Sequence, residues 1–230
     1  TAFKLLKPLA DQGEAEAQAV LAGLYAEGLG TKPNPAEAVA LWKKAAAQNL
    51  SGAQYNLGIM YATGRGVKRD YAEAFKWIKL AADQNIGDAQ RDLASMYEQG
   101  QGVKRDYSLA TDYYRKAANQ GVVEAQFALG SAYAAGRGVT KDMNEAVNWY
   151  RKAANAGMPD AEFNLGAMYF AGEGVAKNLT EAMTWTKKAA DHGHPQARMN
   201  MGLMYINGQG VTKDRGQALE WFRKANASKF

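Results

Sequence analysis

The sequence contains no cysteine, and it has only two histidines and five prolines among its 230 residues. The lack of cysteine excludes disulfides, thiol nucleophiles and thiolate metal sites. No stretch approaches the roughly 18 uninterrupted apolar residues that a membrane-spanning helix requires. No nucleophile elbow, Walker motif or dinucleotide-binding fingerprint is present either. We therefore expect neither an enzymatic activity nor a cofactor.

The two histidines lie close together in the segment DHGHPQA, as His192 and His194. A His-x-His pair can ligate a metal ion, but the spacing of the sequence shows no third protein ligand. We accordingly expect no metal site.

The sequence has instead a repeat of 36 residues, which pairs of glycines of the form Gly-x-Gly mark. Alanine and tyrosine keep fixed places before each pair, and a second alanine follows it. An unbroken period of this length is typical of stacked helical repeats. The first glycines of the six pairs are Gly28, Gly64, Gly100, Gly136, Gly172 and Gly208.

Each repeat predicts two helices, which we name helix A and helix B. In the second repeat, Ala53, Leu57 and Met60 form one apolar stripe of a helix A over residues 50–63. The glycine pair ends this helix, and Asp70 is placed as the N-cap of helix B. A glycine inside a helix costs roughly 1 kcal/mol, so its recurrence predicts close helix packing. These glycines are Gly58, Gly130, Gly166 and Gly202.

One helix pair cannot bury its apolar face alone, so we expect the repeats to stack into a single all-α solenoid. Residues 1–13 match helix B of a preceding, incomplete repeat, which leads us to expect native residues before Thr1. The repeats are expected at about 14–49, 50–85, 86–121, 122–157, 158–193 and 194–230.

The segment AQYNLGIMYATGRGVKRDYAEAFKWIKLAADQN resembles the Sel-one-like repeat (SLR), a relative of the tetratricopeptide repeat. Ala-x-x-x-Leu-Gly-x-x-Tyr, Gly-x-Gly-Val, the aspartate cap and a late Ala-Ala follow in order, and the resemblance covers the whole chain. It implies an α/α right-handed superhelical solenoid used for protein–protein contact. A subgroup of the family carries paired cysteines in each repeat, and the lack of cysteine excludes it.

The same resemblance implies the biological setting, because many bacterial members are secreted, periplasmic or associated with virulence. We expect a non-enzymatic scaffold or adaptor that binds a protein or peptide in a bacterial envelope, secretion or virulence context. The alternative is an immunity or inhibitor protein that neutralises a specific effector enzyme. A periplasmic or secreted location is expected, and a cytoplasmic one stays open. The partner and the oligomeric state stay open as well.

The face of helix A opposite its core stripe varies between repeats, as a recognition surface can. In tetratricopeptide-type superhelices this face lines a concave groove, which suits an amphipathic helix or an extended peptide. Packing between adjacent helices is the alternative for each residue. The candidate binding residues on this face are Tyr55, Ile59, Arg91, Ser95, Glu98, Phe127, Phe163, Phe170, Met199, Leu203 and Ile206.

A second set of candidates shares a register one step round the same helix. A side-chain amide both donates and accepts hydrogen bonds, so a row of asparagines can hold the backbone of a bound peptide. A solvated side chain or an inter-helix hydrogen bond is the alternative. These residues are Asn56, Asp92, Asn164 and Asn200.

Basic pairs such as Arg151-Lys152 recur late in helix B, where the helix dipole favours cations. A solvated outer face accounts for them, because the row lacks exposed aromatics between its charges. The net charge of +5 is also modest beside that of a dedicated nucleic-acid binder. No nucleic acid partner is expected.

Overall fold

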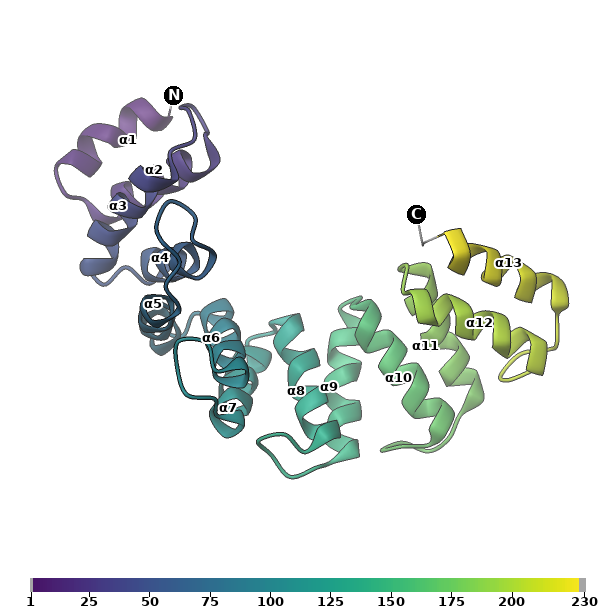
Figure 1. The fold of residues 1–230 in the computed structure, drawn as a ribbon. Helices are drawn as coiled ribbons and strands as arrows, with labels where there is room; N and C mark the ends of the chain where they lie inside the picture. The colour runs from purple at the N-terminus through teal and green to yellow at the C-terminus, as the bar shows by residue number, and fades with distance from the viewer. Residues whose placement is uncertain (1, 228–230) are drawn as a thin grey trace. The chain divides into compact units, whose positions relative to one another are not determined.

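The computed structural model describes residues 2–227, and these residues form thirteen helices and no strand (Figure 1). The helices are α1 (Ala2–Asp11), α2 (Ala15–Glu27), α3 (Pro35–Ala47), α4 (Ser51–Thr63), α5 (Tyr71–Asp83), α6 (Gly87–Gln99), α7 (Tyr107–Asn119), α8 (Val123–Ala135), α9 (Met143–Asn155), α10 (Pro159–Ala171), α11 (Leu179–Asp191), α12 (Pro195–Asn207) and α13 (Arg215–Ala227). None of the helices in this part of the chain is both long and apolar enough to cross a membrane.

The chain divides into two compact units, Thr1–Gln120 and Gly121–Phe230. We name them unit 1, with α1 to α7, and unit 2, with α8 to α13. Within each unit, helix A packs on helix B of the same repeat, as α4 does on α5. Helix B then packs on helix A of the next repeat, as α5 does on α6. Each junction between repeats is therefore built from three consecutive helices.

The glycine turn between α4 and α5 shows why the Gly-x-Gly pair recurs. Gly64 adopts a φ of +74°, and its N–H donates to the carbonyl of Met60, which ends α4. Gly66 also has a positive φ, and a Cβ there would overlap the Pro35 carbonyl of the preceding repeat. The Asp70 carboxylate then accepts hydrogen bonds from the N–H groups of the first turn of α5. The predicted helix end and N-cap are both confirmed.

The glycines inside helix A lie where helix B approaches most closely. A Cβ added to Gly58 would lie 2.5 Å from Cγ1 of Ile78 on α5, and one added to Gly166 would lie 2.8 Å from Oγ1 of Thr186 on α11. Distances under 3 Å leave no room for a methyl group, so the predicted packing requirement is confirmed.

The core of each unit follows the predicted helix A stripe. A fully buried apolar side chain lies in the middle of each helix A, and Leu57, Leu165 and Met201 cluster with alanines of the preceding helix B. Burying a leucine in this way contributes roughly 1.5–3 kcal/mol each. These central side chains are Leu21, Leu57, Leu93, Leu129, Leu165 and Met201.

Buried glutamines join successive repeats in unit 1. The side-chain amide of Gln54 donates to the Ala46 carbonyl at 3.4 Å, and its oxygen accepts from Gln84 at 2.7 Å. The same arrangement recurs at Gln18 and Gln90. Each junction thereby pairs a buried side-chain oxygen and a helix-end carbonyl with amide donors.

The same position in the fifth repeat, within unit 2, carries a different pair. Glu162 is 1% exposed, and its Oε2 lies 2.8 Å from Nδ1 of His192. A buried carboxylate needs such a partner, because an unpaired charge is costly to remove from water. A carboxylate and an imidazole thus replace the two glutamines of unit 1 at the junction of α10, α11 and α12.

Candidate partner-binding surface

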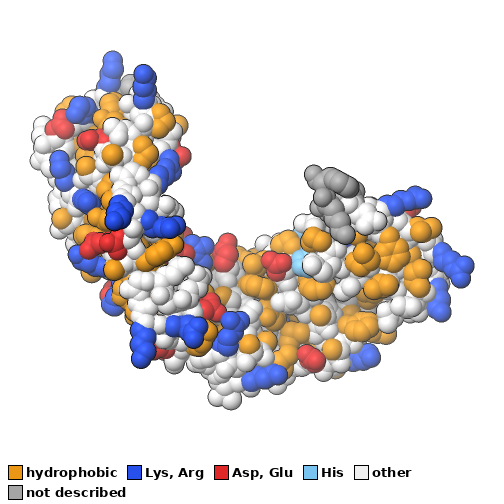
Figure 2. All heavy atoms as spheres, viewed as in Figure 1, with side chains coloured by type: hydrophobic (Ala, Val, Ile, Leu, Met, Phe, Trp, Pro, Cys, Tyr) orange, Lys and Arg blue, Asp and Glu red, His pale blue; other side chains and the backbone are white. Residues whose placement is uncertain are grey.

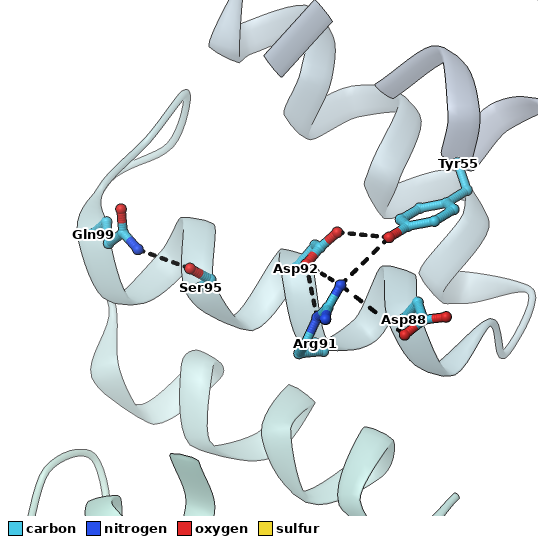
Figure 3. Close-up of polar contacts among 6 residues, drawn as sticks. All are labelled: Tyr55, Asp88, Arg91, Asp92, Ser95 and Gln99. Carbon is cyan, nitrogen blue, oxygen red and sulfur yellow. Dashed lines mark hydrogen bonds and ion pairs between the residues drawn. The ribbon is translucent and has the colours of Figure 1, made fainter. Parts of the chain in front are cut away.

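We name the face of helix A opposite its core stripe the A-face. In unit 1, a cluster of polar side chains occupies it between α4 and α6 (Figure 3). The Tyr55 hydroxyl, from α4, donates to Oδ2 of Asp92 on α6 at 2.8 Å. Arg91 donates to Oδ1 of the same carboxylate at 2.9 Å, and its guanidinium lies 4.0 Å from Asp88. We name Tyr55, Asp88, Arg91 and Asp92 the Asp92 cluster.

Two tyrosine hydroxyls pair with carboxylates on this face. Burial and the adjacent Asp92 carboxylate raise the pKa of Tyr55 above its ordinary value. Tyr114, on α7, donates its hydroxyl to Oε2 of Glu98 at 2.9 Å, and burial with that carboxylate likewise raises the pKa of Tyr114. The A-face of α6 thus carries three carboxylates, of Asp88, Asp92 and Glu98, against the one guanidinium of Arg91.

A small pocket opens on the A-face of unit 1 at the junction of α4, α5 and α6. It has a volume of about 140 Å³. Charged and polar groups contribute to its walls. Its lining residues are Ile59, Ala62, Ile78, Asp92, Ser95, Met96 and Gln101.

The A-face over α10 and α12 in unit 2 is apolar, whereas that of α6 in unit 1 is polar. On the side shown in Figure 2, hydrophobic side chains gather over unit 2, at the right of the view. Four large apolar side chains of α10 and α12 are 38–45% exposed. Three of them, from α12, recur at helical spacing and so share one side of that helix. The four residues are Phe170, Met199, Leu203 and Ile206.

A larger pocket lies on this apolar face at the junction of α10, α11 and α12. Its volume is about 380 Å³. No charged side chain lines it, and the polar side chains in its wall are a threonine, an asparagine and a glutamine. Its lining residues are Gly166, Ala167, Phe170, Ala171, Thr186, Asn200, Leu203, Met204 and Gln209.

The structure divides the candidate residues of the A-face. Phe170 and Leu203 meet in the unit 2 pocket, and Ile59 and Ser95 in the unit 1 pocket. Met199 and Ile206 are exposed on α12 outside the pocket wall. Tyr55, Arg91 and Glu98 are half-buried and take part in the hydrogen bonds described above.

Two phenylalanines of the candidate set pack between helices. Phe127 is half-buried with its ring 5.5 Å from that of Tyr150 on α9. Phe163 is half-buried and stacks on the imidazole of His194 at 4.4 Å. Each ring therefore contacts a neighbouring element and stays partly exposed, and its role in partner binding stays a prediction.

The asparagine register does not form a continuous row of free amides. Asn56 is exposed on α4, whereas Asp92 belongs to the polar cluster of unit 1. Asn164 is half-buried on α10, and Asn200 lines the unit 2 pocket. Asn200 is thus the one asparagine of this register that lies in the wall of a pocket described above.

Both histidines pair with carboxylates of α10. His192 contacts Glu162, and Nε2 of His194 lies 3.3 Å from Asp160. Nδ1 of His194 also accepts the N–H of Ala197 at the start of α12. Within residues 2–227, no group of three or more potential ligands is placed to hold a metal ion. The contacts of both histidines tie α10 to the segment that leads into α12.

The lysines late in helix B lie over tryptophan rings. The ammonium of Lys152 lies 3.6 Å from the ring centre of Trp149, and that of Lys188 lies 3.9 Å from Trp185. Such cation–π contacts are worth about 0.5–1 kcal/mol at exposed sites. The lysines therefore cover the aromatic rings of this face.

Six lining residues of the unit 2 pocket are not among the candidates that the sequence predicted, namely Gly166, Ala167, Ala171, Thr186, Met204 and Gln209. Thr186 belongs to helix B and Gln209 to the glycine turn, both outside the A-face. The buried glutamines and Glu162 were missed too. A signal for them exists, because glutamine recurs every 36 residues from Gln18 until glutamate replaces it at position 162.

The family model of the Sel1 repeat matches six consecutive segments that cover nearly all of the chain. They are residues 15–50, 51–86, 87–122, 123–158, 159–194 and 195–229. The chain belongs to the Sel1 repeat family. Its fold is an all-α solenoid of six repeats, as the sequence predicted. Sel1 repeats typically mediate protein–protein interactions, and Sel1 repeat proteins are generally non-enzymatic scaffolds.

Solved structures of bacterial Sel1 repeat proteins are similar to this chain. One is c5321, a protective antigen present in uropathogenic Escherichia coli strains, with 38% identity and a TM-score of 0.94. The similarity covers 96% of this chain and 48% of c5321, so the chain spans about half the length of that protein. A Sel1 repeat protein from Oxalobacter formigenes is 32% identical, with a TM-score of 0.80 over 93% of this chain and 86% of the other.

The immunity protein PA5088 from Pseudomonas aeruginosa is 22% identical, with a TM-score of 0.54 over 94% of this chain and 82% of that one. At this identity the similarity shows the fold alone. No curated protein sequence matches the chain.

Proposed function

We propose that this Sel1 repeat protein is a non-enzymatic scaffold or adaptor that binds a protein or peptide through its A-face. The apolar surface of unit 2 is its principal contact. One observation carries the proposal: the four large apolar side chains of α10 and α12 are 38–45% exposed around a pocket of about 380 Å³. Exposed apolar surface of this kind marks sites of protein contact.

The arrangement of the apolar side chains indicates how a partner binds. Met199, Leu203 and Ile206 follow one side of α12, and Phe170 extends the surface onto α10. An amphipathic helix or an extended peptide can lay its own apolar side chains along such a surface. Because burial contributes roughly 25 cal/mol per Å² of apolar area, even a short segment gains substantially from this contact.

The Asp92 cluster contributes to partner choice in the same proposal. Its carboxylates exceed its cations, so it favours a partner with a basic residue. The internal hydrogen bonds of Tyr55 and Arg91 hold these carboxylates in place. Charged groups of this kind add more to specificity and to the association rate than to affinity.

The proposed setting is the bacterial envelope or the secreted fraction, with a role in secretion or virulence. The 38%-identical protein c5321 is a protective antigen of uropathogenic strains, which supports this setting. Fractionation of bacteria that produce the natural protein tests it: recovery in the periplasm or medium is expected, and recovery in the cytoplasm alone contradicts it. The immunity alternative stays a prediction of the sequence, because the likeness to PA5088 shows the fold alone.

Affinity capture with matched variants tests the binding surface. Phe170→Asp places a charge on the A-face of unit 2, whereas Leu80→Asp places one at the equally exposed Leu80 of helix α5. We expect Phe170→Asp to lower the apparent affinity for the captured protein by tenfold or more, about 1.4 kcal/mol, and Leu80→Asp to leave it unchanged. Equal retention by both folded variants would show that the assignment of the A-face is wrong.

A further inference from the structure

The side chain at one position of helix B differs in size between repeats. A bulky side chain there fills the space beside helix A at the junction between repeats. In the second, fourth, fifth and sixth repeats, its side chain faces the glycine in the middle of helix A. Five of the six residues in this register are bulky, and the fifth repeat alone has a small polar one, Thr186. The register comprises Trp42, Ile78, Tyr114, Tyr150, Thr186 and Phe222.

The two A-face pockets lie at equivalent places, three repeats apart. Ile78 in the unit 1 pocket corresponds to Thr186 in the unit 2 pocket, and Met96 corresponds to Met204. The volume rises from about 140 Å³ beside Ile78 to about 380 Å³ beside Thr186. Two smaller side chains contribute to this difference, because Thr186 stands where unit 1 has Ile78 and Ala167 stands where it has Ile59.

The fourth repeat shows what fits this place. Tyr150 is only 5% exposed there, and its ring lies where a Cβ of Gly130 would be 2.9 Å away. Its hydroxyl reaches the A-face and lies 3.0 Å from the Ser131 hydroxyl. Tyr114 likewise reaches the A-face of the third repeat, where it contacts Glu98. The junction thus accepts an aromatic ring whose polar end meets the A-face.

We propose that the pocket beside Thr186 receives an aromatic side chain from a polypeptide partner. The inference rests on the proposed function and names the chemistry that the partner presents. The pocket has no charged lining, which selects an uncharged occupant, and Phe170 and Leu203 supply apolar walls. Asn200 and Gln209 offer amides to a neighbouring peptide group. Buried aromatic anchors of this kind dominate binding energy in many interfaces.

A neutral tryptophan derivative provides a direct test. N-acetyl-tryptophanamide is titrated into the ¹⁵N-labelled full chain, and amide shifts are followed by NMR. We expect saturable shifts at Ala167, Thr186, Leu203 and Gln209, with a dissociation constant on the order of 1 mM for a single side chain. Shifts that map elsewhere, or no saturation, would overturn the proposal. Binding of indole with exclusion of the amide-bearing probe would overturn the assignment to a polypeptide.

Three variants make the titration decisive. Thr186→Tyr copies the Gly130–Tyr150 pair of the fourth repeat and fills the pocket, so the probe should bind roughly tenfold more weakly or not at all. Thr186→Val keeps the size of the side chain and should keep the affinity within about twofold. Leu203→Glu changes an exposed residue of the pocket wall. It replaces Thr186→Tyr as the test variant if Thr186→Tyr does not fold, and it should also weaken binding of the probe. Unchanged probe binding in the folded filling or wall variant contradicts the pocket.

The captured partner separates this inference from the proposed function. If Thr186→Tyr binds the partner as the wild type does while Phe170→Asp does not bind it, the pocket does not receive a side chain of the partner. The assignment of the A-face as the binding surface then stands. If the partner binding of both variants is normal, the A-face assignment itself fails. If both variants lose the partner and Thr186→Val retains it, the result supports both the A-face assignment and the pocket as the site of an aromatic side chain.

Discussion

The two A-face pockets have the same place in the repeat but differ in size and chemistry. The unit 1 pocket has Ile78 at its base and Asp92 and Ser95 in its wall, whereas the unit 2 pocket has Thr186, Asn200 and Leu203 at the same positions. The helices around both pockets have equal lengths. A constant scaffold thus produces a small polar depression or a larger apolar pocket through a few side-chain exchanges. In a repeat protein, the departures from the repeat are where function should be sought.

The largest expected effect concerns the part that the two units share. Leu57 in α4 and Leu165 in α10 are both fully buried. Leu57→Ala and Leu165→Ala should each reduce the free energy of unfolding by about 2–5 kcal/mol, because each removes buried methyl groups and leaves a cavity. Urea denaturation followed by circular dichroism measures the loss. A loss under about 1 kcal/mol in one unit alone would show that the two cores are not equivalent.

The single variants Ile78→Thr and Thr186→Ile should differ in their effect on the free energy of unfolding. Ile78→Thr removes apolar packing from a side chain that is 2% exposed, so we expect a loss of about 1–3 kcal/mol. Thr186→Ile fills part of a pocket, so the unfolding free energy should stay within about 0.5 kcal/mol or rise. Thermal unfolding of the two single variants checks this difference. A destabilisation by Thr186→Ile as large as that by Ile78→Thr would mean that the pocket of unit 2 cannot be filled from within.

The Glu162–His192 pair distinguishes the fifth repeat from the repeats of unit 1. Glu162→Ala leaves His192 without its buried partner, and we expect a loss of about 1–3 kcal/mol. The double variant Glu162→Gln/His192→Gln restores the glutamine pair seen at Gln54 and Gln84, so its stability should lie within about 1 kcal/mol of the wild type. Chemical denaturation measures both. If the double variant loses as much as Glu162→Ala, the two junction designs are not interchangeable.

The two tyrosine–carboxylate pairs of unit 1, Tyr55–Asp92 and Tyr114–Glu98, predict a loss of stability at alkaline pH. The pKa values of Tyr55 and Tyr114 are raised above the ordinary value of 10.0 in the folded chain. The folded state therefore holds protons that the unfolded state releases. The stability that these pairs contribute is complete below pH 10 and falls as the pH rises above it. We expect the Tyr55→Phe/Tyr114→Phe variant to lose less stability than the wild type between about pH 9 and 11, as urea midpoints will show.

The smallest expected effect is on partner binding, when a negative charge on the A-face of unit 1 is reversed. Glu98→Lys should weaken partner binding by about two- to fivefold at low salt, and this difference should shrink as salt rises. Phe170→Asp should retain its larger effect at high salt, because it disrupts apolar contact. Binding measured at two salt concentrations separates the two contributions. A salt-independent effect of Glu98→Lys would argue against electrostatic recognition at this face.

The sequence predicted the parts of the structure that recur. The 36-residue period located the helices, Asp70 marked a helix start, and Gly58 marked a close helix contact, because each depends on local geometry that every repeat must satisfy. Periodicity could not decide which A-face residues pack and which stay exposed. Phe163 and Met199 share one register, yet a stacking His194 partly covers the first while the second is exposed.

The unit 2 pocket could not be predicted from the A-face alone. It depends on Thr186, a helix B residue that is small only in comparison with its equivalents in the other repeats. Aligning the repeats at this position would have shown the exception. The volume that the exception leaves open depends on how α10, α11 and α12 pack, and only the structure provides that.

The most direct test is the NMR titration of the reciprocal variant Ile78→Thr/Thr186→Ile with N-acetyl-tryptophanamide. If the helix B side chain sets which junction is open, probe-induced shifts will disappear from α10, α11 and α12. Weak shifts will appear around α4, α5 and α6, where Asp92 makes the wall less suited to an apolar ring. Shifts that remain in unit 2 at wild-type affinity would contradict this account.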